Sequence, residues 1–157
     1  MSNGPWVGKS VLIIDDSAGV REDLSRAFTA VGMIVKGTAV NGVAGLEMLR
    51  ALRPDIVSID IIMPEMDGIE CYRKIQQIAP ETVCIMISWL AGEPKILDNL
   101  KAVIPSHLFQ VKPVTPDDLE ARLKKIYFPD QQDKAVPRPS DPKAADSVFG
   151  SLGIKVS

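Results

Sequence analysis

The sequence has little of what marks secreted, membrane-bound or nucleic-acid-binding proteins. It contains only two cysteines, Cys71 and Cys84, which fit reduced buried thiols better than a disulfide framework. The formal net charge is only −2, and acidic and basic residues are interspersed along the chain. No basic stripe therefore indicates a nucleic acid partner, and no polybasic helix indicates a membrane surface.

Long hydrophobic runs are also missing. The longest apolar stretch, residues 83–91 with Ser88 inside it, is about half of the ~20 residues that span a bilayer. Residues 1–9 lack the basic segment followed by an apolar segment that is typical of a secretion signal. We therefore expect a soluble, cytoplasmic protein, with one domain because 157 residues suit a single core.

The chain does contain four short, mostly apolar runs and a fifth strand-like segment at 33–38, which alternate with segments of helical period. The runs predict strands at residues 10–14, 33–38, 56–59, 82–88 and 108–111. The helical segments follow Ser17, cover about 41–52, follow a turn at 63–68, cover 93–103 and begin at Thr115. Strict alternation of the two kinds of element predicts an α/β fold, a doubly wound five-stranded parallel sheet with five helices.

Apolar residues at helical spacing predict the buried faces of four of these helices: Val20, Leu24, Ala27, Phe28 and Val31; Val43, Leu46 and Leu49; Ile69, Tyr72, Ile75 and Ile78; Leu119, Leu123, Ile126 and Tyr127. Two helices carry signs of weakness. Gly42 and Gly45 weaken the second helix by about 1 kcal/mol each relative to alanine. Gly92 and Pro94 before the fourth helix, and Pro105 after it, predict an irregular segment there.

Polar side chains of related chemistry stand at the ends of four expected strands. Asp15 and Asp16 follow the first strand, Asp60 the third, and Ser88 and Lys112 end the fourth and fifth. The carboxyl ends of parallel strands meet at one edge of a sheet, where these side chains can converge. Three carboxylates attract a hard cation such as Mg²⁺. A carboxylate can also attack a phosphoryl group once a divalent cation and a lysine neutralise the charge on its oxygens.

With these residues the chain resembles the receiver domains of response regulators in two-component signalling, of the chemotaxis-type single-domain kind. The matching features are the Asp15-Asp16 pair, Asp60 followed by the sequence IIMPEMDG, Ser88, and the Lys112-Pro113 pair, in that order. The separation of 44 positions between Asp16 and Asp60 (60 minus 16) also suits that family. The resemblance covers about residues 9–128 and implies the flavodoxin-like receiver fold.

The resemblance implies a role for each acidic residue of the site. Asp60 would accept a phosphoryl group from a phosphohistidine of a sensor histidine kinase or of a histidine phosphotransfer protein. Asp16 would bind Mg²⁺ directly and Asp15 largely through water, with Asp60 and the backbone carbonyl of Ile62 as further ligands. The protein would then be a phosphoacceptor that promotes its own phosphorylation, and not an enzyme acting on a separate substrate.

The resemblance also implies how the phosphorylated state is read. Ser88 and Lys112 would hold the phosphoryl oxygens, and Phe109 would be a switch that turns inward when Ser88 moves. The peptide bond between Lys112 and Pro113 would be cis, which a proline amide allows at a cost of only ~1 kcal/mol. An output protein would bind the face made by the fourth helix, fifth strand and fifth helix, and the regulator would be a monomer or a homodimer.

Several residues depart from the family pattern. Trp89 follows Ser88, where the family usually has a small residue, and its indole could crowd the approach to Asp60. Ile62 and Leu90 stand two residues beyond Asp60 and Ser88, and apolar side chains there cannot orient an attacking water. We therefore expect slow self-hydrolysis of the phosphorylated form.

A segment before the fifth strand also departs from the family. Pro105, Ser106 and His107 occupy positions where a Gly-Ala pair is common, so the exit of the fourth helix is expected to be irregular. His107 is the only histidine, and we expect an ordinary loop residue there and not a ligand or a phosphohistidine.

The composition changes after Phe128. Four prolines among polar residues predict an extended linker at 129–146. Residues 147–157 form a short apolar tail whose spacing suits either an added strand or one helical turn. The tail is either disordered or a motif that docks on a partner or on the receiver itself. It is too short for a DNA-binding or enzymatic output domain, so a stand-alone regulator is expected.

Two other functions are considered beside the phosphorylation switch. A degenerate receiver would bind partners without phosphate, but the intact Asp15, Asp16, Asp60 and Lys112 disfavour this. A phosphatase of the haloacid dehalogenase type also uses a strand-end aspartate, Mg²⁺ and a lysine. That class normally needs a second aspartate two residues after the nucleophile, and the residue here is Ile62.

Overall fold

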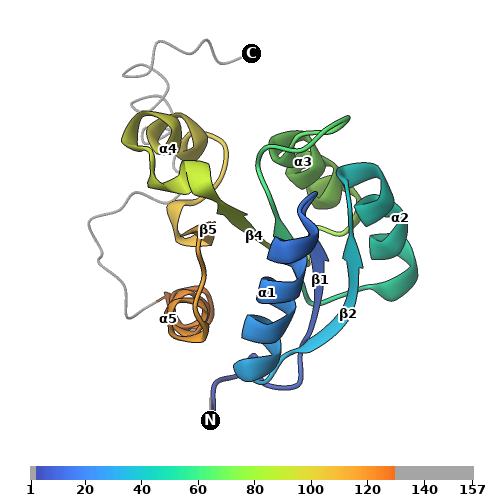
Figure 1. Ribbon diagram of the computed structural model, residues 1–157, viewed down its shortest axis with the longest axis vertical. Helices are drawn as coiled ribbons and strands as arrows, with labels where there is room; N and C mark the ends of the chain where they lie inside the picture. The colour runs from blue at the N-terminus through green and yellow to red at the C-terminus, as the bar shows by residue number, and fades with distance from the viewer. Residues whose placement is uncertain (1–2, 130–157) are drawn as a thin grey trace.

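The computed structural model describes residues 3–129, without the side chains of Ala91 and Gly92. Within them lies a five-stranded parallel sheet between two layers of helices (Figure 1). The strand order is β2-β1-β3-β4-β5. The strands are β1 Ser10–Ile14, β2 Ile34–Ala39, β3 Ile56–Ile59, β4 Val83–Ser88 and β5 Phe109–Val111. This order and direction confirm the doubly wound α/β fold.

The helices follow the strands in alternation. They are α1 Ala18–Ala30, α2 Gly42–Leu52, α3 Gly68–Ile78, α4 Pro94–Lys101 and α5 Pro116–Tyr127, with short 3-10 helices η1 Trp89–Gly92 and η2 Ser106–Leu108. The residues of α1 and α5 pack on one face of the sheet, and those of α2, α3 and α4 pack on the other. No helix in the described part of the chain has the length and apolar character needed to span a bilayer.

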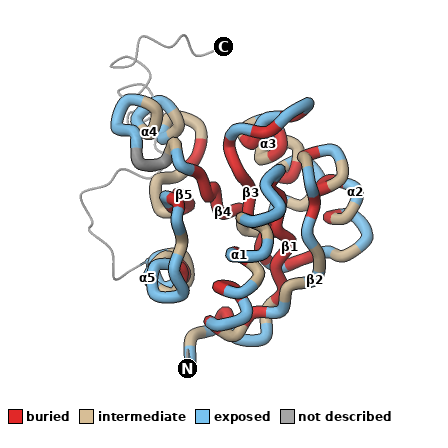
Figure 2. Tube along the Cα trace, viewed as in Figure 1, coloured by how far each residue is buried: buried red, intermediate tan, exposed pale blue. Residues whose placement is uncertain are grey.

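The strands supply the centre of the core (Figure 2). Alternate residues of a strand point to opposite faces, so Leu12 and Ile14 join the cluster under α2 and α3 while Val11 and Ile13 join the one under α1 and α5. All five residues of β1 are buried, as a strand covered on both faces requires. The buried strands therefore fix the positions of the loops that follow their carboxyl ends.

Side-chain caps explain where four of the helices begin. Ser17, Asn41, Asp67 and Thr115 each accept a hydrogen bond from the backbone N–H three residues ahead. Thr115 also forms a reciprocal capping box with Asp118. Each cap satisfies a backbone donor that the first helical turn leaves unpaired.

Two residues predicted to face the core are exposed. Val43 of α2 is 45% exposed and Ile78 of α3 is 37% exposed. In α2 Gly45 faces the sheet instead, and a Cβ atom there would lie 2.3 Å from Cδ1 of Ile14, while a Cβ atom at Gly42 would lie 2.9 Å from Sδ of Met66 in the loop before α3. Gly45 therefore allows α2 to approach the sheet closely, which turns Val43 outward. Ile78 is the last residue of α3, whose buried face is formed by Cys71 and Ile75.

The fourth helix is irregular, as the sequence predicts. It has eight residues, which is shorter than the expected 93–103, and none of the residues assigned to α4 is buried. η1 precedes it and η2 follows it, with Pro105 at the start of η2. An α-helix cannot continue through Pro94 or Pro105 without losing backbone hydrogen bonds, so short 3-10 helices lie on either side of α4.

Trp6 is part of the core although it precedes the segment that carries the family resemblance. It is only 1% exposed, and its indole Nε1–H donates a hydrogen bond to the carbonyl oxygen of Val31 at 3.1 Å. Its ring centroid lies 6.1 Å from that of Tyr127. Trp6 therefore joins the amino terminus to the carboxyl ends of α1 and α5.

Candidate functional site

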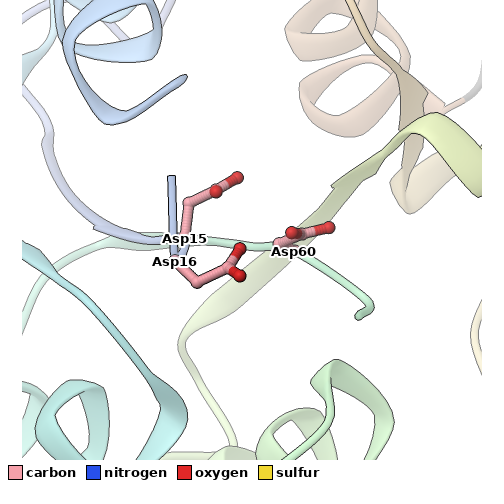
Figure 3. Close-up of side chains that lie close together, drawn as sticks. All are labelled: Asp15, Asp16 and Asp60. Carbon is pink, nitrogen blue, oxygen red and sulfur yellow. The ribbon is translucent and has the colours of Figure 1, made fainter. Parts of the chain in front are cut away.

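Three acidic side chains converge at the carboxyl edge of the sheet (Figure 3). Asp15 and Asp16 follow β1, and Asp60 follows β3. One carboxylate oxygen from each lies within 4.8 Å of the others. The register of the sheet explains this, because Ile14 pairs with Ile59 and the N–H of Asp60 donates to the carbonyl of Ile14 at 3.0 Å.

The Asp15 carboxylate is buried and both of its oxygens are hydrogen-bonded. Oδ1 accepts from the backbone N–H of Ser17 at 2.9 Å, and Oδ2 accepts from Nζ of Lys112 at 2.7 Å. Arg21 also donates to the backbone carbonyl of Asp15 at 2.7 Å. These bonds fix the orientation of Asp15 and use one acceptor site on each of its oxygens.

The Asp16 carboxylate is exposed, in contrast to its neighbour. Within residues 3–129 the structure records no hydrogen bond or ion pair to its side chain. Asp16 is therefore free to supply oxygen ligands, while Asp15 is held by protein groups. Carboxylate oxygens around a partly open position are the donors that Mg²⁺ prefers, since this ion keeps several of its waters. The three residues therefore fit a magnesium ion.

Lys112 lies between the two buried acids. Its Nζ is 2.7 Å from Asp15 and 3.5 Å from Oδ2 of Asp60, and its side chain is buried. β5 places it there, because Val111 pairs with Ser88 and the N–H of Lys112 donates to the carbonyl of Ser88 at 3.2 Å. The peptide bond from Lys112 to Pro113 is cis, as expected.

Burial raises the pKa of the Asp60 carboxyl above its usual value. The positive charge of Lys112 opposes this effect, and the negative charge of Asp15 adds to it. Hydrogen bonds from Ser88 and from the backbone of Ile61 lower the pKa by smaller amounts. The charged form of Asp60 is therefore costly in the protein alone, and an added cation at the site stabilises it.

Ser88 and Phe109 lie on adjacent strands beside the acids. Ser88 is buried at the end of β4, and its Oγ accepts from the N–H of Leu90 at 3.3 Å. Phe109 begins β5, pairs with Met86 of β4 and is buried in the core. The structure thus has the aromatic ring in an inward position, next to the strand that carries Ser88.

Of the three apolar departures from the family pattern, Leu90 is half-buried against the core and the other two are exposed. Ile62 is 62% exposed and Trp89 is 60% exposed. Trp89 begins η1 and lines a groove together with Lys112 and residues of α1. The indole is therefore largely exposed and is not packed into the core.

The loop after Asp60 depends on a glycine. The N–H of Gly68 donates to the carbonyl of Ile61 at 2.7 Å, which closes the loop between β3 and α3. A Cβ atom at Gly68 would lie 2.2 Å from the carbonyl oxygen of Asp60. The sequence marks Gly68 as a turn residue, but its contact with the acceptor backbone and the bond from Arg21 to Asp15 carry no sequence signal that identifies them.

The histidine and the cysteines lie outside the site, as expected. His107 is half-buried in η2, where its carbonyl accepts from Arg122 at 3.3 Å. Burial and the charge of Arg122 lower the pKa of His107. Cys71 and Cys84 are free, buried thiols, and burial raises the pKa of each to about 12, which disfavours thiolate chemistry.

Comparison with known proteins agrees with this geometry. Residues 11–124 match the family model of the response regulator receiver domain. The chain is 38% identical over 120 residues to the chemotaxis protein CheY of Thermotoga maritima, covering 76% of this chain and 98% of that protein. It is 33% identical over 115 residues to the chemotaxis protein CheY of Bacillus subtilis, covering 73% and 94%. A chain in the solved CheX-CheY-BeF₃-Mg complex of Borrelia burgdorferi superposes with a TM-score of 0.68 at 31% identity, covering 77% and 90%.

Proposed function

The chain belongs to the response regulator receiver family, and from this premise we propose that phosphorylation of Asp60 switches its binding to another protein. The phosphoryl donor is a phosphohistidine of a sensor histidine kinase or of a histidine phosphotransfer protein. The reaction takes place in the cytoplasm and requires Mg²⁺. The observation that carries the proposal is the position of Lys112 between Asp15 and Asp60.

The proposed reaction is an in-line transfer to a carboxylate. An oxygen of Asp60 forms a bond to phosphorus while the P–N bond to the donor imidazole breaks, and the electron pair of that bond stays on the imidazole. Bound Mg²⁺ supplies charge neutralisation on the phosphoryl oxygens. Asp16, Asp60 and the backbone carbonyl of Ile62 are its proposed ligands.

Lys112 and Ser88 provide the remaining contacts to the product. The Lys112 ammonium, already 3.5 Å from Asp60, is within reach of a phosphoryl oxygen once the acceptor is modified. Ser88 is the last residue of β4, and we propose that its hydroxyl donates to a second phosphoryl oxygen. We propose Phe109 as the switch residue: its ring is already buried in this structure, and movement of Ser88 toward the phosphoryl group leaves space that favours this inward position.

The switched surface is the face made by α4, β5 and α5. α4 has no buried residue among those assigned to it, so a modest shift of α4 costs little core packing, whereas Leu119 and Leu123 hold α5 in the core. The Borrelia relative comes from a complex of CheX, CheY, BeF₃ and Mg. By analogy, we propose that a protein partner of this chain recognises its phosphorylated state.

A direct test uses beryllium fluoride as a phosphoryl mimic with the full chain and Mg²⁺. We expect saturable binding, seen as a bound ¹⁹F resonance, that disappears when Mg²⁺ is removed. Asp60→Asn removes the acceptor and abolishes the signal, whereas Asp67→Asn makes the same chemical change at an exposed helix cap and retains it. A bound signal in Asp60→Asn, or none in the parent, favours the degenerate receiver instead.

A further inference from the structure

A groove of about 500 Å³ runs between α1 and the segment that joins β5 to α5. Its apolar lining comes from Val20, Leu24 and Ala27 of α1 on one side and from Pro113 and Val114 on the other, with Trp89 at its edge. The exposed fraction of the Trp89 side chain is 60%, which is high for the largest apolar residue type. The groove is thus an apolar surface with a large uncovered aromatic side chain.

We propose that this groove binds the chain's own apolar segment 147–156, which lies outside the described residues. The segment contains Val148, Phe149 and Leu152 at the spacing of one helical turn, with Ile154 and Val156 beyond them. An amphipathic turn of this kind buries its apolar side chains in a groove lined by aliphatic and aromatic groups.

The length of the connecting chain suits this site. Pro116, the first residue of α5, lines the groove. The described part of the chain ends two residues after Tyr127, the last residue of α5. The 12 residues of α5 span about 18 Å. An extended connection of the 17 residues 130–146 reaches up to about 53 Å, at about 3.1 Å per residue, which exceeds this span. The segment can therefore reach the groove, and its covalent attachment raises its local concentration there above that of a free peptide.

The polarity of the lining favours this groove over another one of similar size. A second groove, of about 560 Å³, lies between the carboxyl ends of α2 and α3 and is bordered by four charged residues, Arg50, Arg53, Asp55 and Glu81. The segment 147–156 is mostly apolar, with Lys155 as its one charged residue, so it would desolvate those charges without pairing them. The groove beside α1 presents Asp23 and Arg26, which pair with each other, together with Lys112, which pairs with the buried acids.

Docking of the segment has a consequence that rests on the proposed function. Lys112 lines the groove and also lies 3.5 Å from Asp60, so a segment seated on Trp89 stands beside the phosphoacceptor. A phosphohistidine-bearing protein then competes with the segment for the approach from this side. The tail thereby restrains phosphotransfer from a protein donor.

The test measures quenching of tryptophan fluorescence by acrylamide in the full-length protein. Trp6 and Trp89 are the only tryptophans, and Trp6 is 1% exposed, so a change in quenching reports on Trp89. In the double variant Phe149→Ser, Leu152→Ser we expect the quenching constant to rise about twofold or more, because covalent attachment favours docking of the parent segment and the variant segment lacks the apolar side chains that would dock. Val136→Ser in the linker is the matched control and leaves quenching unchanged.

Two further measurements decide the outcome. A peptide of residues 147–157 added to the double variant lowers quenching again at millimolar concentration if the groove is its site. Equal quenching in the parent and in the double variant overturns the proposal. So does a difference that depends on protein concentration, since it means that the segment binds a second copy. None of these readouts requires phosphorylation, so failure of the proposed function leaves the docking result intact.

Discussion

Lys112 donates a hydrogen bond of 2.7 Å to Asp15, a residue 97 positions earlier in the chain. Both side chains are buried, and this bond joins the end of β5 to the end of β1 across β3 and β4. It commits one oxygen of Asp15 and directs the ammonium group toward Asp60. The site is therefore ordered before any cation or phosphoryl group is bound, and its charge is balanced only in part.

Replacing Asp60 is expected to stabilise the protein in the absence of Mg²⁺. Burial raises the folded-state pKa of Asp60, so its charged form costs free energy of folding. Because the folded pKa lies above the unfolded one, this cost is absent at pH below the unfolded value and develops as pH rises toward the folded value. We expect Asp60→Asn to raise the free energy of unfolding by about 1 kcal/mol at pH 7, as relief of a buried charge does.

The measurement is urea unfolding at pH 7 and again near pH 4, where the gain shrinks. Asp67→Asn serves as the control, because asparagine also caps a helix and Asp67 is exposed. A gain that is the same at both pH values, or a loss of stability at pH 7, contradicts this explanation.

Asp16→Asn is expected to separate magnesium binding from metal-free stability. The Asp16 carboxylate is exposed and has no recorded partner within residues 3–129, so its loss changes the free energy of unfolding by less than about 0.5 kcal/mol without metal. With excess Mg²⁺ the parent gains about 1 kcal/mol or more by mass action, and the variant gains much less. Thermal unfolding with and without Mg²⁺ measures both quantities. An unchanged response to Mg²⁺ in the variant excludes Asp16 as a ligand.

Gly68→Ala is expected to disturb the acceptor loop. The new Cβ would lie 2.2 Å from the carbonyl oxygen of Asp60, and backbone cannot move aside as a flexible side chain can. We expect a loss of about 2 kcal/mol in the free energy of unfolding and weaker binding of beryllium fluoride. Gly19→Ala is the matched control in α1, where the nearest atom, Oγ of Ser17, is 4.0 Å away. That change is expected to stabilise the helix by about 0.5–1 kcal/mol. Comparable effects of the two substitutions would argue against the loop contact.

The phosphorylated form is expected to be long-lived. Ile62 is exposed beside Asp60 and carries no group that can orient an attacking water. Ile62→Asn supplies such a group, and we expect it to shorten the lifetime of the acyl phosphate about tenfold. Loss of phosphoprotein after removal of the donor measures the lifetime, and Ile78→Asn is a control at another exposed isoleucine. A parent lifetime of seconds defeats this prediction.

The sequence was sufficient to predict the sheet and the residues at its edge. The runs 11–14 and, apart from Ser58, 56–59 are apolar, and the polar residues that follow them mark the strand ends, so Asp15 and Asp60 could be placed side by side. The caps at Ser17 and Thr115 were similarly readable, because one side chain and its own backbone decide them.

Close packing was harder to predict. An amphipathic pattern treats Val43 as a core residue and Gly45 as a weak point, but the approach of α2 to Ile14 reverses those roles. Trp6 precedes the first strand without any periodic pattern and finds its place only through Val31 and Tyr127, which are distant in sequence. Such contacts depend on how the helices and strands pack against one another, and the spacing of apolar residues within one helix or strand does not reveal that packing.

The partners of individual site residues also required the structure. The sequence assigned Lys112 to the phosphoryl group, yet in this state the same ammonium pairs with Asp15 more closely than with Asp60. The order of the strands brings Lys112 to one oxygen of Asp15, and the local bond from the Ser17 N–H holds the other. Asp16 has neither bond, which is the difference between the two acids.

The central claim, that Asp60 accepts a phosphoryl group, is tested most directly by intact-protein mass spectrometry. The full chain is incubated with Mg²⁺ and a small acyl phosphate donor, and the modified residue is located after borohydride reduction of the acyl phosphate. We expect one Mg²⁺-dependent phosphoryl group per chain, located at Asp60 and absent from Asp60→Asn. Phosphorylation that persists in Asp60→Asn, or a parent chain that remains unmodified under these conditions, would contradict the account.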